Sequence, residues 1–213
     1  MKIGVFDSGK GGTTVLAAIK ELIPDAEYQY VADSKNCPYG EKSSQELNDI
    51  VSGIVDRLLD WGADIIVIAC NTVTTKCIDY LRHKYPDVPF VGTEPAIKLA
   101  SKTGAKKILV MATPGTIESE RTAHLIAESR RPGQKITLLA CPGLADAIES
   151  DMGVKSKLDE LLTGVPRDFD AVVLGCTHYS LIKDKIKKYF DSATLIDGNM
   201  GVAKRVKSIV EQM

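Results

Sequence analysis

The chain has 213 residues, of which 44% are hydrophobic, and its 27 basic and 28 acidic residues give a formal net charge of −1. The two signs are interspersed, so the sequence lacks the basic surface expected of a protein that binds nucleic acid or an anionic membrane. No apolar run approaches the ~20 residues of a membrane span, and the N-terminal residues lead into a predicted strand rather than a secretion signal. We therefore expect a cytoplasmic globular protein with no nucleic-acid or membrane partner.

Eight short apolar runs, rich in β-branched residues, alternate with amphipathic helical stretches. In chain order the predicted strands are residues 2–6, 27–32, 64–69, 88–92, 106–112, 135–140, 170–175 and 193–197. Such runs are typical of parallel strands that are buried on both faces in an α/β protein. One further helical stretch, GVAKRVKSIVEQ, follows the last strand.

Two of these strands share a pattern that indicates an internal repeat. DIIVIAC ends at Cys70 and DAVVLGC ends at Cys176, and the similar runs KIGVF and KILVM precede them at nearly equal distances. Chance similarity between parallel strands is the alternative explanation. The repeat predicts two pseudo-symmetric α/β lobes with parallel sheets, with the active site in the cleft between them.

The first strand runs into a glycine-rich turn, VFDSGKGGTT. A nucleotide-binding loop of the GxxxxGK[ST] type needs a lysine after its second glycine, and this turn has none in that place. A strand, a glycine turn and a helix start still leave backbone N–H groups free to bind an anion. Because Asp7 is better suited to a proton-transfer site than to a phosphate site, we expect the turn to border a site for a small carboxylate.

The five cysteines are odd in number and no two are spaced CxxC, so we expect thiols rather than disulfides or a zinc site. Cys70 and Cys176 stand at strand ends, where a helix N-terminus can lower the pKa of a thiol. Two thiols on opposite faces of one substrate could invert a stereocentre, one removing a proton and the other supplying one. The alternative is that both cysteines only pack in the core.

The segments GVFDSGKGG, DSKNCPYGEKS, VIACNT, VGTEPA, ATPGTIES, ACPGLADAIE, LGCTHYS and LIDG follow one another over nearly the whole chain. Together they resemble the glutamate racemases, a branch of the aspartate/glutamate racemase superfamily. The resemblance implies an isomerase that interconverts L- and D-glutamate and supplies D-glutamate for bacterial peptidoglycan, without pyridoxal phosphate, metal or nucleotide. His178 favours this branch, because Thr-Glu follows the second cysteine in aspartate racemases. A homodimer is compatible with the resemblance.

The same resemblance implies a role for each matching residue. Cys70 would be the base acting on D-glutamate and Cys176 the base acting on L-glutamate, with Asp7 assisting the first cysteine. His178 would act near the second cysteine, and Glu149 would orient that histidine. The matching substrate-pocket residues are Ser8, Pro38, Tyr39, Gly40, Asn71, Thr72, Thr113, Thr116 and Thr177. Of these, Asn71, Thr72 and Thr177 would hold the α-carboxylate, and Ser8, Tyr39 and Gly40 the distal one.

We expect the first lobe to comprise residues 1–94 plus 198–213, and the second lobe residues 95–197. Family members usually continue past LIDG with further helices, so we expect less covering of the first lobe here. Cys37, beside the Pro38-Tyr39-Gly40 turn, could border the pocket, but we expect it to pack. Cys77 is predicted to lie in the core, Cys141 to shape a turn at a strand end, and His83 and His124 to lie on the surface.

Two other functions stay open at this stage. The chain could be an aspartate racemase or another isomerase of the superfamily, or it could bind acidic amino acids without turning them over.

Overall fold

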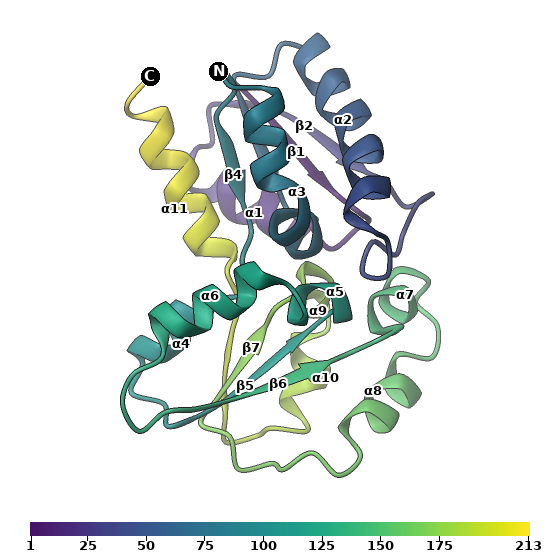
Figure 1. Ribbon diagram of the computed structural model, residues 1–213, viewed down its shortest axis with the longest axis vertical. Helices are drawn as coiled ribbons and strands as arrows, with labels where there is room; N and C mark the ends of the chain where they lie inside the picture. Colours follow the sequence, from purple (N-terminus) through teal and green to yellow (C-terminus); the bar gives the residue numbers. More distant parts are fainter.

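The computed structural model describes all residues from 1 to 213 and consists of two lobes, each built on a four-stranded parallel sheet (Figure 1). The first sheet has the order β2-β1-β3-β4, with bounds Lys2–Asp7 (β1), Glu27–Ala32 (β2), Ile65–Ile68 (β3) and Phe90–Gly92 (β4). The second has the order β6-β5-β7-β8, with bounds Lys107–Ala112 (β5), Lys135–Ala140 (β6), Ala171–Leu174 (β7) and Thr194–Ile196 (β8). The predicted fold class and all eight predicted strands are confirmed.

Eleven helices cover the two sheets. Those of the first lobe are α1 (Thr13–Leu22), α2 (Ser44–Asp60), α3 (Asn71–Lys84) and α11 (Asn199–Val210). The second lobe has α4 (Ile97–Lys102), α5 (Pro114–Ile117), α6 (Glu120–Ser129), α7 (Leu144–Glu149), α8 (Val154–Leu162), α9 (Thr177–Leu181) and α10 (Lys183–Lys187). None of the helices combines the length and the apolar character needed to cross a membrane.

Side chains that alternate along the central strands divide the first-lobe core into two layers. On β3, Ile65 and Val67 pack with α1 and α11, whereas Ile66 and Ile68 face α2 and α3. All four are fully buried, as expected of a parallel strand with helices on both sides. The expectation of burial on both faces is wrong for β2 and β6, because these strands lie at sheet edges and are only partly covered.

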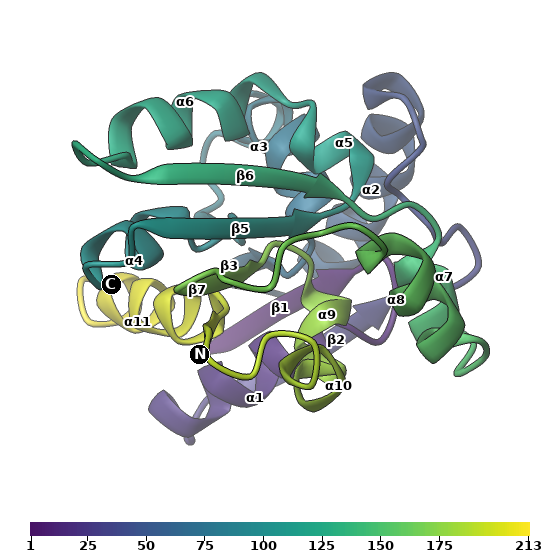
Figure 2. The same ribbon diagram turned by 90° about the horizontal axis from the view of Figure 1, so that it is seen from below.

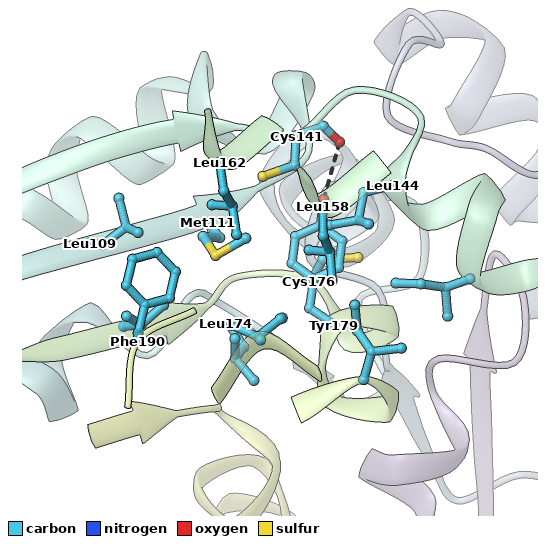
Figure 3. Packing of buried hydrophobic residues seen from close by; sticks show 14 of the residues in the cluster. Leu109, Met111, Cys141, Leu144, Leu158, Leu162, Leu174, Cys176, Tyr179 and Phe190 are labelled. Carbon is cyan, nitrogen blue, oxygen red and sulfur yellow. Dashed lines mark hydrogen bonds between the residues drawn. The ribbon is translucent and has the colours of Figure 1, made fainter. Parts of the chain in front are cut away.

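The second lobe follows the same rule. Figure 3 shows its larger cluster, to which Leu109 and Met111 of β5 and Leu158 and Leu162 of α8 belong. The opposite face of the sheet packs against α4 and α6. Cys176 belongs to the cluster drawn in Figure 3 and therefore lies where the core of the second lobe meets the first lobe.

The two sheets have the same strand order, offset by four strands, as the internal repeat predicts. In each sheet the chain adds its second strand on one side of the first strand and its third strand on the other side. The segments that follow β1 and β3, or β5 and β7, therefore diverge and leave a crevice at the carboxyl ends of these two strands. This is where open α/β sheets place their ligands. Asp7 is the last residue of β1 and Cys70 follows β3, whereas Thr113 follows β5 and Cys176 follows β7.

The chain passes between the lobes twice, once between β4 and α4 and once between β8 and α11. After the second passage α11 packs beside α1, with Val202, Ala203 and Val206 against the first sheet (Figures 1 and 2). We propose that the lobe boundaries lie at Glu94–Pro95 and Asp197–Gly198, within these two passages.

Candidate active site

Both predicted cysteines line one small enclosed cavity at the contact between the lobes. Its wall consists of Ser8, Cys37, Pro38, Tyr39, Gly40, Cys70, Asn71, Thr72, Thr113, Ala145, Cys176, Thr177 and His178. The cavity measures about 20 Å³, close to the roughly 10–15 Å³ that a single ordered water needs. A larger polar cleft lies between α3, α5 and α6, but neither cysteine borders it. An amino acid can therefore enter the site only if the lobes or the loop around Tyr39 move outward.

Asp7 lies behind the cavity wall and is completely buried. Its Oδ2 accepts a 2.6 Å hydrogen bond from the Gly12 N–H and a 3.3 Å hydrogen bond from the Thr177 hydroxyl of the other lobe. Ser8 connects the carboxylate to Cys70, with 3.5 Å from its hydroxyl to Oδ1 and 3.9 Å to the cysteine Sγ. Burial raises the pKa of Asp7 above its ordinary value, although the nearby His178 and the Gly12 N–H counteract it. The carboxyl is thus held beside Cys70 in a setting that favours proton exchange.

The expected lowering of the thiol pKa values is not found in this closed state. Burial raises the pKa of both Cys70 and Cys176, and the Asp7 carboxylate raises it further. The first turns of α3 and α9 act in the expected direction, because the Val73 N–H points at Cys70 and the His178 and Tyr179 N–H groups point at Cys176. Desolvation outweighs these hydrogen bonds.

Buried thiols make folding sensitive to alkaline pH. The ordinary thiol pKa is 9.0, and above it the unfolded chain loses protons that the folded chain keeps, so the free energy of unfolding falls as pH rises. Each such thiol contributes up to about 1.4 kcal/mol per pH unit. We expect urea unfolding between pH 8 and 10 to show a shallower decline for the double variant Cys70→Ala/Cys176→Ala than for the native chain. Equal slopes would contradict the shifted pKa values.

The two ring nitrogens of His178 contact different side chains, the carboxylate of Glu149 and the thiol of Cys176. The His178 Nε2 lies 2.9 Å from the Glu149 Oε2, and the side chains of the pair are 2% and 19% exposed. The other ring nitrogen, Nδ1, lies 3.9 Å from the Cys176 Sγ. Burial raises the pKa of Glu149, but hydrogen bonds from Ser34, Lys10 and His178 lower it more, and the net shift is downward. The carboxylate therefore accepts the Nε2 proton and leaves Nδ1 facing the thiol.

Three hydroxyl groups form a buried cluster across the lobes. The Thr72 Oγ1 of the first lobe lies 3.0 Å from the Thr113 Oγ1 and 3.4 Å from the Thr116 Oγ1 of the second. Thr72 and Thr113 reach the cavity, whereas Thr116 lies behind them and is fully buried. Thr72 and Thr113 thus offer neutral donors to the cavity, whose wall also includes Asn71.

The glycine turn proves to be a contact surface for the other lobe. A Cβ on Gly9 would lie 2.5 Å from the Glu149 Oε2, and a Cβ on Gly11 would lie 2.6 Å from the His178 backbone nitrogen. Only glycine allows the first lobe to approach these two residues so closely. The turn therefore supports the cavity from behind, and of its residues only Ser8 belongs to the wall.

This close approach predicts a large difference between two glycine substitutions. We expect Gly11→Ala to destabilise the fold by about 1–3 kcal/mol, because the backbone of α9 has to shift. Gly53→Ala is the matched control, since Gly53 lies inside α2 and a Cβ added there would meet no atom within 4 Å, and it should stabilise by about 0.5–1 kcal/mol. Urea unfolding of both variants measures the difference, and a neutral Gly11→Ala would refute the close contact.

Two further residues belong to the wall. Cys37 was expected to pack rather than to border the pocket, and it does border the cavity, where burial raises its pKa to about 12. Its position directly before the Pro38-Tyr39-Gly40 turn was the available signal. Ala145 also borders the cavity and carries no chemical signal in the sequence.

The remaining expectations for cysteines and histidines agree with the structure. Cys77 is buried in the first-lobe core. Cys141 begins a turn after β6, with its carbonyl accepting from the Leu144 N–H, and is also buried in the second-lobe core. The Tyr179 hydroxyl donates to the same carbonyl, the dashed line of Figure 3. His83 and His124 are exposed. No group of three or more His, Cys, Asp or Glu side chains is arranged to hold a metal ion.

Residues 9–205 match the model of the Asp/Glu/Hydantoin racemase family. The chain belongs to this family. The match includes both strand-end cysteines, His178 and Glu149. Racemases are isomerases, so the predicted enzyme class and the predicted family are confirmed.

Curated relatives extend the match over most of their length. The chain is 38% identical over 211 residues to the glutamate racemase of Clostridium acetobutylicum, which covers 96% of this chain and 82% of the relative. It is 39% identical over 219 residues to the glutamate racemase of Clostridium perfringens (strain ATCC 13124), and this match covers 99% of this chain and 83% of the relative.

Solved structures of this racemase family share both lobes. The Escherichia coli glutamate racemase in complex with L-glutamate and the activator UDP-MurNAc-ala has a TM-score of 0.89 and 33% identity, with 99% of this chain and 82% of that chain covered. The Francisella tularensis glutamate racemase in complex with D-glutamate has a TM-score of 0.83 and 28% identity, with 99% of this chain and 81% of that chain covered. The Picrophilus torridus aspartate racemase, at 17% identity and a TM-score of 0.65, shares the fold.

Proposed function

We propose that this family member is a glutamate racemase that inverts the α-carbon with two cysteines and no cofactor. The observation that carries the proposal is that Cys70 and Cys176, from equivalent strand ends of two lobes with the same strand order, line one enclosed cavity. The glutamate racemases that match nearly the whole chain support glutamate as the substrate.

The two thiols exchange roles in each turnover. With D-glutamate bound, the Cys70 thiolate takes the α-proton, and the electron pair of the C–H bond remains on the α-carbon and its carboxylate. The Cys176 thiol then gives its proton to the opposite face of that carbon. L-glutamate leaves with Cys70 as thiol and Cys176 as thiolate, and the reverse reaction restores the first state.

Asp7 and His178 are proposed to move protons to and from these thiols. Asp7 reaches Cys70 through Ser8, and its raised pKa suits a group that gains and loses a proton. His178 presents Nδ1 to the Cys176 sulfur, and Glu149 fixes the ring by accepting the Nε2 proton. Each thiol thus has a partner for proton transfer in its own lobe.

The carboxylates of glutamate are proposed to be bound by neutral donors, because no lysine or arginine lines the cavity. The α-carboxylate would lie against Asn71, Thr72 and Thr177, with first-turn N–H groups of α3 nearby. The distal carboxylate would lie against Ser8, Tyr39 and Gly40. Thr113 and Thr116 hold the Thr72 hydroxyl in place, and Pro38 shapes the loop that closes the cavity.

Two wider proposals rest on this activity. A mechanism that needs two free thiols requires a reducing compartment, and all five cysteines are free, which supports action in the cytoplasm. The D-glutamate formed would be used for bacterial peptidoglycan, as the resemblance to glutamate racemases implies.

Chiral chromatography after incubation with L-Glu, D-Glu, L-Asp or D-Asp, without added cofactor, tests the proposed function. We expect each glutamate enantiomer to become a racemic mixture and both aspartates to stay unchanged. Inversion of aspartate alone would assign the chain to the other substrate. Calorimetric binding of glutamate without any inversion would show a binding protein instead.

A further inference from the structure

Glu149, the partner of His178, is held mainly by residues of the opposite lobe. Its Oε1 accepts a 2.6 Å hydrogen bond from the Ser34 hydroxyl, and its Oε2 accepts a 2.9 Å hydrogen bond from the Lys10 backbone N–H. Both donors belong to the first lobe, whereas Glu149 and His178 belong to the second. The same Oε2 lies 2.9 Å from the His178 Nε2.

The segment around Lys10 fixes this contact in two more ways. Gly9 touches the carboxylate so closely that a Cβ would lie 2.5 Å from it. The Lys10 Nζ lies 2.7 Å from the Asp151 Oδ2, two residues after Glu149, in an exposed ion pair. The carboxylate that orients the histidine is therefore shaped around the first lobe, and separation of the lobes would remove two of its three donors together.

We propose that Ser34 is a positioning residue that acts through Glu149, so that His178 takes its working orientation against Cys176 only when the first lobe has closed over the cavity. The proposal rests on the proposed racemase activity and deepens it. Because a cavity of about 20 Å³ has no room for an amino acid to pass, the lobes have to move apart for substrate entry and approach again around the substrate. Tying the histidine to closure would restrict proton transfer at Cys176 to an enclosed substrate.

Ser34 is the donor that can be removed by substitution, since the Lys10 donor is a backbone group. In Ser34→Ala, water replaces the hydroxyl on Oε1 but does not fasten the carboxylate to the first lobe. Ser34→Thr keeps a hydroxyl and should rescue the function. Asp151→Asn is the matched control, because it neutralises the ion pair with Lys10 and leaves all three donors of Glu149 in place. Asn also accepts the positive φ of 55° at this position.

The first readout is independent of turnover. The chain has three histidines, of which His83 and His124 are exposed and His178 has a side chain that is only 2% exposed. A ring N–H signal in slow exchange with water in the proton NMR spectrum should therefore come from His178. We expect this signal to shift or broaden in Ser34→Ala and to stay as in the native chain in Ser34→Thr and Asp151→Asn. An unchanged signal in Ser34→Ala would overturn the proposal.

The second readout separates a positioning role from a general structural one. With Cys70 replaced by Ala, only the half of the site with Cys176 and His178 can exchange the α-proton of glutamate with D2O; with Cys176 replaced, only the half with Cys70 can. Adding Ser34→Ala should slow exchange about tenfold or more in the first background, within the ~10²-fold that a 1 Å misplacement can cost. It should leave exchange in the second background unchanged.

Equal slowing in both backgrounds would overturn the positioning role, because a loosened loop would affect both halves. A native chain that exchanges no α-proton, but whose His178 signal responds to Ser34→Ala alone, would overturn the proposed racemase activity and support the link between Ser34 and His178. The two failures are thus distinguishable.

Discussion

Replacing either Cys70 or Cys176 by Ala is expected to reduce glutamate racemisation by about 10²–10⁴-fold, the range that a positioned acid or base contributes. Both thiols line the one cavity, and each turnover uses one as base and the other as acid. Loss of either group therefore interrupts inversion in both directions. Chiral chromatography with each enantiomer measures the loss.

The two variants should differ in the exchange that remains. Cys176→Ala keeps Cys70 and should still exchange the α-proton of D-glutamate with D2O, whereas Cys70→Ala should exchange only that of L-glutamate. Cys77→Ala is the control, since Cys77 is buried in the first-lobe core outside the cavity wall and should retain racemisation. If one cysteine variant keeps full racemisation, the chemistry uses a single thiol and the two-thiol mechanism fails.

Asp7→Asn is expected to lower kcat by about 10²–10⁴-fold. Asn keeps the shape of the side chain and can still accept from the Gly12 N–H, but it cannot exchange a proton with Cys70. In the Cys176→Ala background the substitution should also slow exchange of D-glutamate, and in the Cys70→Ala background it should leave exchange of L-glutamate in place. Racemisation assays with each enantiomer measure the loss of kcat, and proton NMR in D2O measures the exchange of the α-proton.

The stability of Asp7→Asn distinguishes a catalytic carboxyl from a structural one. Burial raises the pKa of Asp7 above its ordinary 3.8, so the folded chain holds this proton more tightly than the unfolded chain does. The free energy of unfolding then falls as pH rises from 3.8 to the folded-state pKa, and Asn removes this loss. We expect the variant to melt at the same or a higher temperature at about pH 7. A large decrease in melting temperature would show that Asp7 mainly stabilises the fold.

Much of the fold could be predicted because its signals are local. The central strands are continuous β-branched runs, such as Ile65–Ile68, and their burial on both faces follows from the helices on either side. The edge strands β2 and β6 have similar composition, and nothing in their sequence indicates that one side lacks a neighbour. Edge position is a property of the whole sheet and emerges only from the strand order.

The position of the site was predictable for a related reason. Strand-end residues at a reversal of strand order lie together in any sheet of this type, so Asp7 and Cys70 had to meet in one lobe, and Thr113 and Cys176 in the other. That the two crevices face each other is seen in the contacts of Gly9 with Glu149 and of Gly11 with His178, which only the structure displays.

Effects that depend on both lobes together were beyond the sequence. The raised pKa values of the thiols come from complete desolvation, which depends on how tightly the lobes close. The hydrogen bonds of Ser34 and Lys10 to Glu149 join positions more than a hundred residues apart. Neither contact has a local pattern that would identify it.

The most direct test of the two-thiol mechanism is proton NMR of the native chain in D2O with L- or D-glutamate alone, stopped at low conversion and followed by chiral separation. We predict that the inverted product carries deuterium at the α-carbon while the recovered substrate still carries hydrogen, because the proton leaves to one thiol and the deuteron arrives from the other. Deuterium in recovered substrate before inversion, or no α-proton exchange with either enantiomer, would contradict the account.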